Sequence, residues 1–145
     1  MTTNTLSADI EDFVVKSNER LLSVMRGSLR DMIEDMQTPV KKGGRMRVDT
    51  GFLRASGRGS LEGFPSGVGE KPADAPTGQY TGIYDNFDGT ALNAVLLNME
   101  LGDTFFWGWV ARYAPLREIY DGFMDTALQN WQGYVTTNSE RFRGK

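Results

Sequence analysis

The stretch VDTGFLRASG at residues 48–57 can be interpreted in two ways, and the choice between them decides which fold and function the rest of the chain is expected to have. Asp-Thr-Gly is the signature of an aspartic protease, in which two carboxylates share a proton. The same triplet can instead form a turn that starts a short helix, because Asp and Thr side chains accept hydrogen bonds from the first helical amides. One interpretation predicts a catalyst, and the other predicts a structural corner.

The residues around the triplet favour the corner. The approach, KKGGRMRV at residues 41–48, is flexible and cationic where a protease requires an apolar strand. Nearby guanidinium groups would also keep the Asp49 carboxylate ionised, so that it could not share a proton. Asp49 or Thr50 can cap a helix over residues 52–55, with the basic side chains outside. The predicted structural corner consists of Asp49, Thr50, Gly51, Leu53 and Arg54.

Composition excludes several classes of enzyme. The 145 residues, 1–145, fit one domain and contain no His and no Cys. Ser-His-Asp and Cys-His nucleophiles are therefore impossible, and so are the usual zinc sites. The sequence has no apolar stretch long enough to span a membrane and no signal-peptide pattern. We expect no enzymatic activity, no cofactor, no metal and no membrane partner.

Charge is distributed unevenly along the chain. Residues 41–58 hold six basic residues and one acidic residue, a local charge of +5 in a chain of net charge −3, so the remainder carries −8. This segment could be a nucleic-acid-binding module that tracks phosphates. It could also dock on an acidic surface of another copy of the chain. Only Phe52 interrupts the basic residues with an aromatic ring, which favours docking between copies. The six are Lys41, Lys42, Arg45, Arg47, Arg54 and Arg58.

Periodicity predicts a helix at each end of the chain. Apolar residues from Ile10 to Met36 recur at helical spacing, with Ser7 as the N-cap and Thr38-Pro39 as the end. Residues 122–142 form the second predicted helix, capped by Asp121. The polar segment 137–145 is expected to fray as a tail.

Strands are expected between these helices. Residues 91–115 read as a hairpin around a Leu-Gly-Asp-Thr turn at 101–104, and its second strand places Phe105, Trp107 and Trp109 on one face. That face could stack nucleic-acid bases, but burial under the long helix is favoured. Residues 57–82 are rich in Gly and Pro and predict a flexible loop or assembly arm, with a short strand near its start. The predicted class is α+β, a small antiparallel sheet packed by the two helices.

The order of these motifs resembles the tail-completion, or neck, protein family of long-tailed bacteriophages. This family includes the HK97 gp10-like and lambda minor tail protein Z-like proteins. Residues 48–51 and 53–56 match its first motif, and Tyr113-Ala114 with Glu118 match its second. Residues 122–124, Gln129 and Trp131 match the last. Arg47 stands where the family prefers proline, and the second motif contains one extra residue.

The resemblance implies a structural virion protein, assembled in the host cytoplasm, that forms a homo-oligomeric ring between the head connector and the tail. Sixfold symmetry would match the tail, and twelvefold symmetry the connector. The implied partners are head-closure or connector proteins and tail-terminator or tail-tube proteins, with genomic DNA passing through the lumen. A head-closure or tail-terminator protein is the alternative within this class. The predicted interface residues are Lys41, Lys42, Arg45, Arg47, Arg58, Tyr113 and Glu118.

Overall fold

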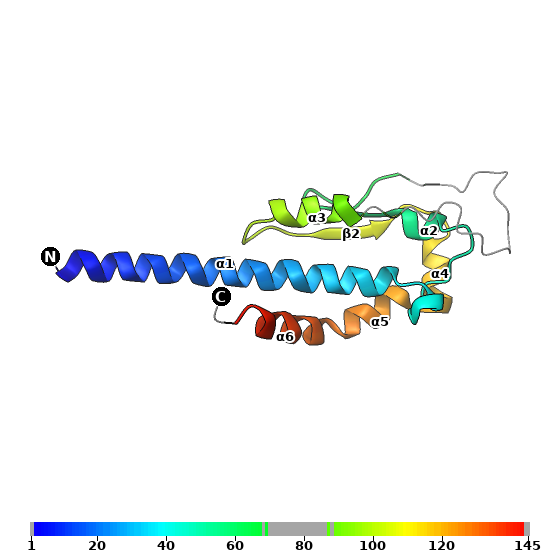
Figure 1. Cartoon of the computed structure of the whole chain (residues 1–145). Helices are drawn as coiled ribbons and strands as arrows, with labels where there is room; N and C mark the ends of the chain where they lie inside the picture. The colour runs from blue at the N-terminus through cyan, green and yellow to red at the C-terminus, as the bar shows by residue number, and fades with distance from the viewer. Residues whose placement is uncertain (1, 68, 70–86, 88, 144–145) are drawn as a thin grey trace.

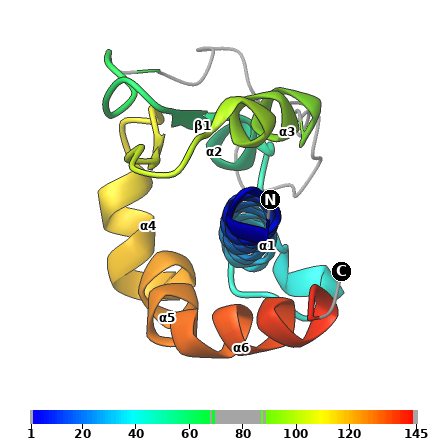
Figure 2. The ribbon, with the colours of Figure 1, turned by 90° about the vertical axis from the view of Figure 1, so that its left-hand side faces the viewer.

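A computed structural model describes residues 2–67, 69, 87 and 89–143, and its fold is α+β, as predicted. One helix, α1, runs along the whole molecule (Figure 1). Viewed along its axis, α3 and the β-ribbon lie on one side of α1, and α5 and α6 lie on the other (Figure 2). The elements are α1 (Thr2–Gln37), η1 (Val40–Lys42), α2 (Phe52–Ala55), β1 (Gly57–Ser60), α3 (Gly89–Asn98), β2 (Phe106–Trp109), α4 (Ala114–Asp121), α5 (Phe123–Gln129) and α6 (Trp131–Arg141).

The long N-terminal helix is confirmed, although it begins earlier than predicted. Ser7 lies inside α1 and is not its N-cap, because no Gly or Pro in residues 2–6 interrupts the propagating helix. In the second half of α1, Ile33 and Met36 are buried at the expected spacing. The helix ends at Gln37 because the residue before Pro39 disfavours helical backbone.

The predicted hairpin is wrong in its first strand. Residues 89–98 form α3, since Ala and Leu are strong helix formers and Leu92, Leu96 and Met99 share one buried face at helical spacing. The second strand is β2, which pairs antiparallel with β1 in the register Gly57 to Trp109. The short strand predicted near residue 57 is therefore the true partner. The predicted arm, 57–82, thus begins with a strand, and its residues 68 and 70–82 lie outside the described residues.

The aromatic face of β2 is half-buried and packs against the core along α1, in the direction predicted. Phe105, Trp107 and Trp109 pack against the core cluster that contains Ile33 and Leu96. The rings of Trp107 and Trp109 meet edge to face, with centroids 5.8 Å apart. Aromatic pairs favour this geometry inside proteins, so the face has a structural use here and is no open platform for bases.

The predicted C-terminal helix is two helices. α5 and α6 are separated at Asn130, and Asp121 is the last residue of α4 and does not cap α5. The Glu118 carboxylate takes that role, accepting hydrogen bonds from the amides of Met124 (2.9 Å) and Asp125 (2.8 Å). Residues 137–141, expected to fray, continue α6.

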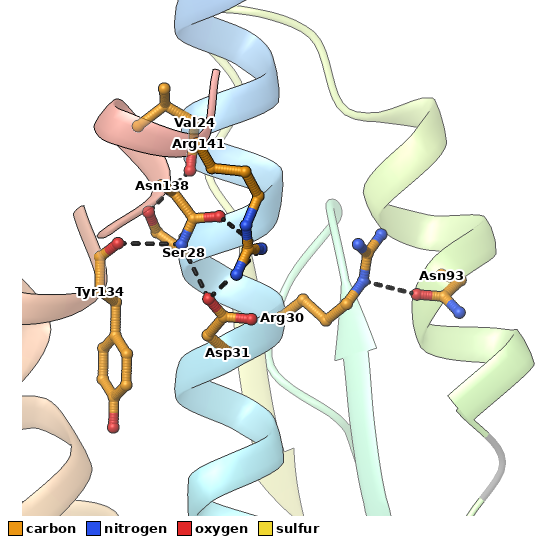
Figure 3. Close-up of polar contacts among 8 residues, drawn as sticks. All are labelled: Val24, Ser28, Arg30, Asp31, Asn93, Tyr134, Asn138 and Arg141. Atoms are coloured by element: carbon orange, nitrogen blue, oxygen red, sulfur yellow. Dashed lines mark hydrogen bonds and ion pairs between the residues drawn. The ribbon is translucent and has the colours of Figure 1, made fainter. Parts of the chain in front are cut away.

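Polar contacts hold α6 against α1 (Figure 3). The fully buried Asn138 side chain donates to Asp31 Oδ2 (2.8 Å) and to the Tyr134 carbonyl (2.9 Å). Its Oδ1 accepts from Arg141 (3.2 Å). A Cβ on Gly27 would lie 2.1 Å from that oxygen, so only glycine permits this approach of the helices. The polar end of the chain is therefore part of the fold.

A second core cluster lies beneath residues 46–53. It consists of Met46, Leu53, Ala111, Ala114 and Phe123, and Trp109 contacts both this cluster and the one along α1. Within the described part of the chain, no helix is both long and apolar enough to cross a membrane.

Candidate interaction site

The stretch around Asp-Thr-Gly forms the predicted corner. Thr50 is buried, and its hydroxyl accepts a hydrogen bond from the Phe52 amide (3.3 Å). Gly51 has a φ of 88°, a left-handed conformation that glycine adopts without the strain of a Cβ. Leu53 points into the second core cluster. The N-cap residue of α2 is Gly51, and not Asp49 or Thr50 as predicted. The Thr50 hydroxyl instead closes a short turn onto the Phe52 amide, two residues later in the chain.

Gln37 ties this corner to the end of α1. Its side-chain amide donates to the Arg54 carbonyl (2.8 Å), and Arg54 Nε donates back to the Gln37 carbonyl (2.8 Å). The Gln37 side-chain oxygen accepts from Trp109 Nε1 (2.8 Å). Sequence reasoning missed Gln37, although its position four residues after Ile33, on the buried face of a helix, marks it as a polar group that needs partners.

Arg54 is correspondingly half-buried, contrary to the expectation that the basic side chains remain outside. Its guanidinium also lies over the Phe87 ring, 5.6 Å from the centroid. Arg58 is exposed on β1 but donates hydrogen bonds to the carbonyls of Ala55 and Gly57. The six basic residues of 41–58 therefore divide into four on one loop and two that bind the backbone of the corner.

Tyr113, predicted as an interface residue, lies under the corner. Burial raises the pKa of its phenol, a hydrogen bond with the Leu53 backbone opposes this rise, and the Asp49 carboxylate adds to it. The ring is half-buried, with its centroid 6.4 Å from that of Phe52. The corner thus gathers Asp49, Leu53 and Tyr113 from distant parts of the sequence.

The remaining four cations project from one closed loop, residues 40–47, hereafter the basic loop. Its ends are joined because the Val40 amide donates to the Met46 carbonyl (3.0 Å) and the Met46 amide donates to the Thr38 carbonyl (3.3 Å). The Met46 side chain is fully buried and anchors the loop in the second core cluster. The exposed side chains are Lys41, Lys42, Arg45 and Arg47.

The basic loop borders a pocket of about 420 Å³ against α5. Phe123 and Ala127 supply apolar wall, and Lys42 and Arg45 supply positive charge. On another wall, Tyr134 donates to the Asp35 carboxylate. Burial, followed by this hydrogen bond, raises the pKa of Tyr134 to about 12, so its hydroxyl stays protonated at neutral pH. The pocket suits a group that is part apolar and part anionic.

Exposed apolar side chains lie beside the basic loop, on α4 and α5. Arg47 Nε is 3.8 Å from Asp121 Oδ1, which places the loop against the end of α4. The Asp121 carboxylate also accepts a hydrogen bond from Arg117 Nε (3.1 Å), so it interacts with one arginine from α4 and one from the basic loop. Glu118 is engaged with the α5 amides, an internal role that the sequence analysis did not anticipate. The exposed apolar residues are Leu116, Ile119, Tyr120, Met124 and Leu128.

The site presents both charged and apolar surface. Among the described residues, no group of three or more carboxylates is placed to hold a metal ion. No protein-family model, curated protein or solved structure matches this chain. What the site combines is a basic loop, an apolar surface and a pocket between them.

Proposed function

We propose that this chain is a structural subunit of a bacteriophage neck, forming a ring that joins the head connector to the tail. It catalyses no reaction and takes no cofactor. Its proposed partners are further copies of itself, the head-closure or connector protein on one side, and the tail-terminator or tail-tube protein on the other. The proposal begins from the order of the sequence motifs, which resembles that of the tail-completion family.

The observation that carries the proposal is the basic loop. Four cations stand on a loop whose ends are hydrogen-bonded and whose buried Met46 fixes it to the core. Ordering such a loop in advance lowers the entropy cost of association. A fixed cationic surface next to exposed apolar residues suits a permanent protein contact, in which charge sets the register and apolar burial supplies affinity.

Binding of nucleic acid is the competing function, and the exposed cations favour it. The aromatic face of β2 does not, because Trp107 and Trp109 pack against the core. In a ring, the same loops could face DNA in the lumen. Affinity that falls steeply with salt would indicate phosphate contacts.

Electron microscopy of the purified chain and of virus particles labelled with an antibody to it tests the proposal. We expect rings from the purified chain and label at the junction of head and tail. A matched variant, Lys41→Gln/Lys42→Gln/Arg45→Gln, should assemble more weakly while keeping its thermal stability, because these side chains are exposed. Particles without label, together with salt-sensitive DNA binding by a monomer, would contradict the neck function and favour the nucleic-acid module.

A further inference from the structure

The first half of α1 leaves the body of the molecule with an apolar face exposed (Figure 1). Just after α6, Phe142 lines one pocket together with Lys16 and Ser23 of α1. Beyond this point the helix continues toward Thr2, and Figure 1 shows no other labelled element alongside it. The N-terminal stripe, as we call the exposed apolar residues that share one side of this half, consists of Leu6, Ile10, Phe13, Val14 and Leu21. Val15 is also exposed, but helical spacing places it on another side.

The N-terminal stripe has the form of a docking surface. Its members recur at three- and four-residue intervals, so they share one side of the helix, and the same side becomes buried at Val24. Phe13 is 71% exposed and Ile10 is 55% exposed. Contiguous exposed apolar patches of this kind mark interaction sites. Helices in proteins gain most of their stability from the packing of an apolar face against other elements. A partner that covers the stripe would supply such packing for this half of α1.

Charge indicates what covers the stripe. Residues 2–15 contain three acidic residues and no basic residue, and the Lys16 that follows is ion-paired with one of them, Asp12, at 2.9 Å. At the opposite end of the molecule, the α4–α5 surface (Leu116, Ile119, Tyr120, Met124 and Leu128) is exposed beside the basic loop. The two ends of the molecule are therefore complementary in two respects. The apolar stripe matches the apolar α4–α5 surface, and the acidic residues beside the stripe match the cations of the basic loop. The acidic residues are Asp9, Glu11 and Asp12.

We propose that the N-terminal stripe of one copy docks on the α4–α5 surface of the next copy, with the acidic residues facing the basic loop. This inference rests on the proposed ring, for which it names the two surfaces that join neighbouring subunits. The contact covers both exposed surfaces at once, whereas pairing two stripes with each other would leave the α4–α5 surface in water. Contacts between two different surfaces repeat around an axis and close a ring when the rotation permits.

Two variants separate the surfaces. Ile10→Gln/Phe13→Gln removes the apolar contacts of the stripe, and Leu116→Gln/Ile119→Gln removes those of the α4–α5 surface. All four positions are at least half exposed and helical, and Gln is a good helix former, so both variants should fold. Leu97→Gln, at an exposed position on α3, is the matched control. Circular dichroism confirms folding before assembly is compared.

Sedimentation velocity then measures assembly of each protein alone and in mixtures. Wild type and Leu97→Gln should form the same oligomer. Each double variant alone should associate at least about tenfold more weakly, which is the loss expected for a central apolar contact. An equimolar mixture of the two double variants should give a 1:1 heterodimer and nothing larger, because each retains one intact surface.

Three outcomes would overturn the inference. If only the stripe variant fails to assemble, stripes pair with each other. If both variants assemble like wild type, other surfaces build the oligomer, and the proposed neck function survives without this contact. If wild type is a monomer at every concentration, a second copy is not the occupant, and antibody label on virus particles still decides the neck function separately.

Discussion

Substituting Gly27 by Ala tests how closely α1 and α6 must approach. The new Cβ would lie 2.1 Å from Asn138 Oδ1 and 2.9 Å from its Cγ, so the Asn138 side chain must move. That side chain is fully buried and takes part in hydrogen bonds with Asp31, Arg141 and the Tyr134 carbonyl. Losing three bonds at about 1 kcal/mol each costs about 3 kcal/mol. In a helix interior, Ala is more favourable than Gly by about 1 kcal/mol, which offsets part of this loss.

The expected net loss is therefore about 2 kcal/mol of the free energy of unfolding. Urea denaturation of four proteins measures it: wild type, Gly27→Ala, Asn138→Ala and the double variant. In the Asn138→Ala background the clash is gone, so Gly27→Ala should then be neutral or stabilising. A Gly27→Ala protein as stable as wild type, or equal losses in both backgrounds, would refute the reasoning from close approach.

Three further predictions concern the corner, the α5 cap and the pocket. Thr50→Val should cost about 1 kcal/mol of stability through the lost hydrogen bond to the Phe52 amide. Neither wild type nor Asp49→Asn should show peptidase activity, and acid proteolysis abolished by Asp49→Asn would restore the protease interpretation. Glu118→Ala should cost about 1 kcal/mol in thermal denaturation, and Glu118→Gln less, because the amides of α5 lose their acceptor only in the first. Raising the pH from 10 toward 12 should destabilise wild type, since the unfolded Tyr134 ionises first while the pKa of the folded group is raised to about 12. Tyr134→Phe should flatten that part of the curve of stability against pH, and an unchanged slope would contradict the raised pKa.

Local periodicity accounts for what the sequence predicted correctly. The buried face of α1, the aromatic face of β2 and the turn at Thr50 depend on residues close together in the chain, so spacing and side-chain chemistry determine them. The Leu-rich run of α3 was misread because strand and helix both tolerate short apolar runs. Packing against α1 decides between a strand and a helix here, and the local sequence of residues 89–98 does not encode that packing.

The candidate site depended more heavily on tertiary structure. The Arg54 side chain was expected to lie outside and Tyr113 to lie at an interface. Both are half-buried, because the corner brings Gln37 to Arg54 and Leu53 to Tyr113. Glu118 looked like an interface carboxylate, yet the break between α4 and α5 offers it two free amides. The cations of the basic loop are exposed as expected, since Met46 is the side chain by which the loop is anchored in the core.

The free half of α1 also acts as a ruler. With 36 residues rising 1.5 Å each, α1 measures about 54 Å, but only its second half has a length fixed by packing. Seven residues added or removed before Val24 would displace the tip by about 10 Å and, at close to two turns, keep the orientation of the stripe. In the proposed ring, subunit spacing would thus change through helix length alone, while the core and corner keep their sequence.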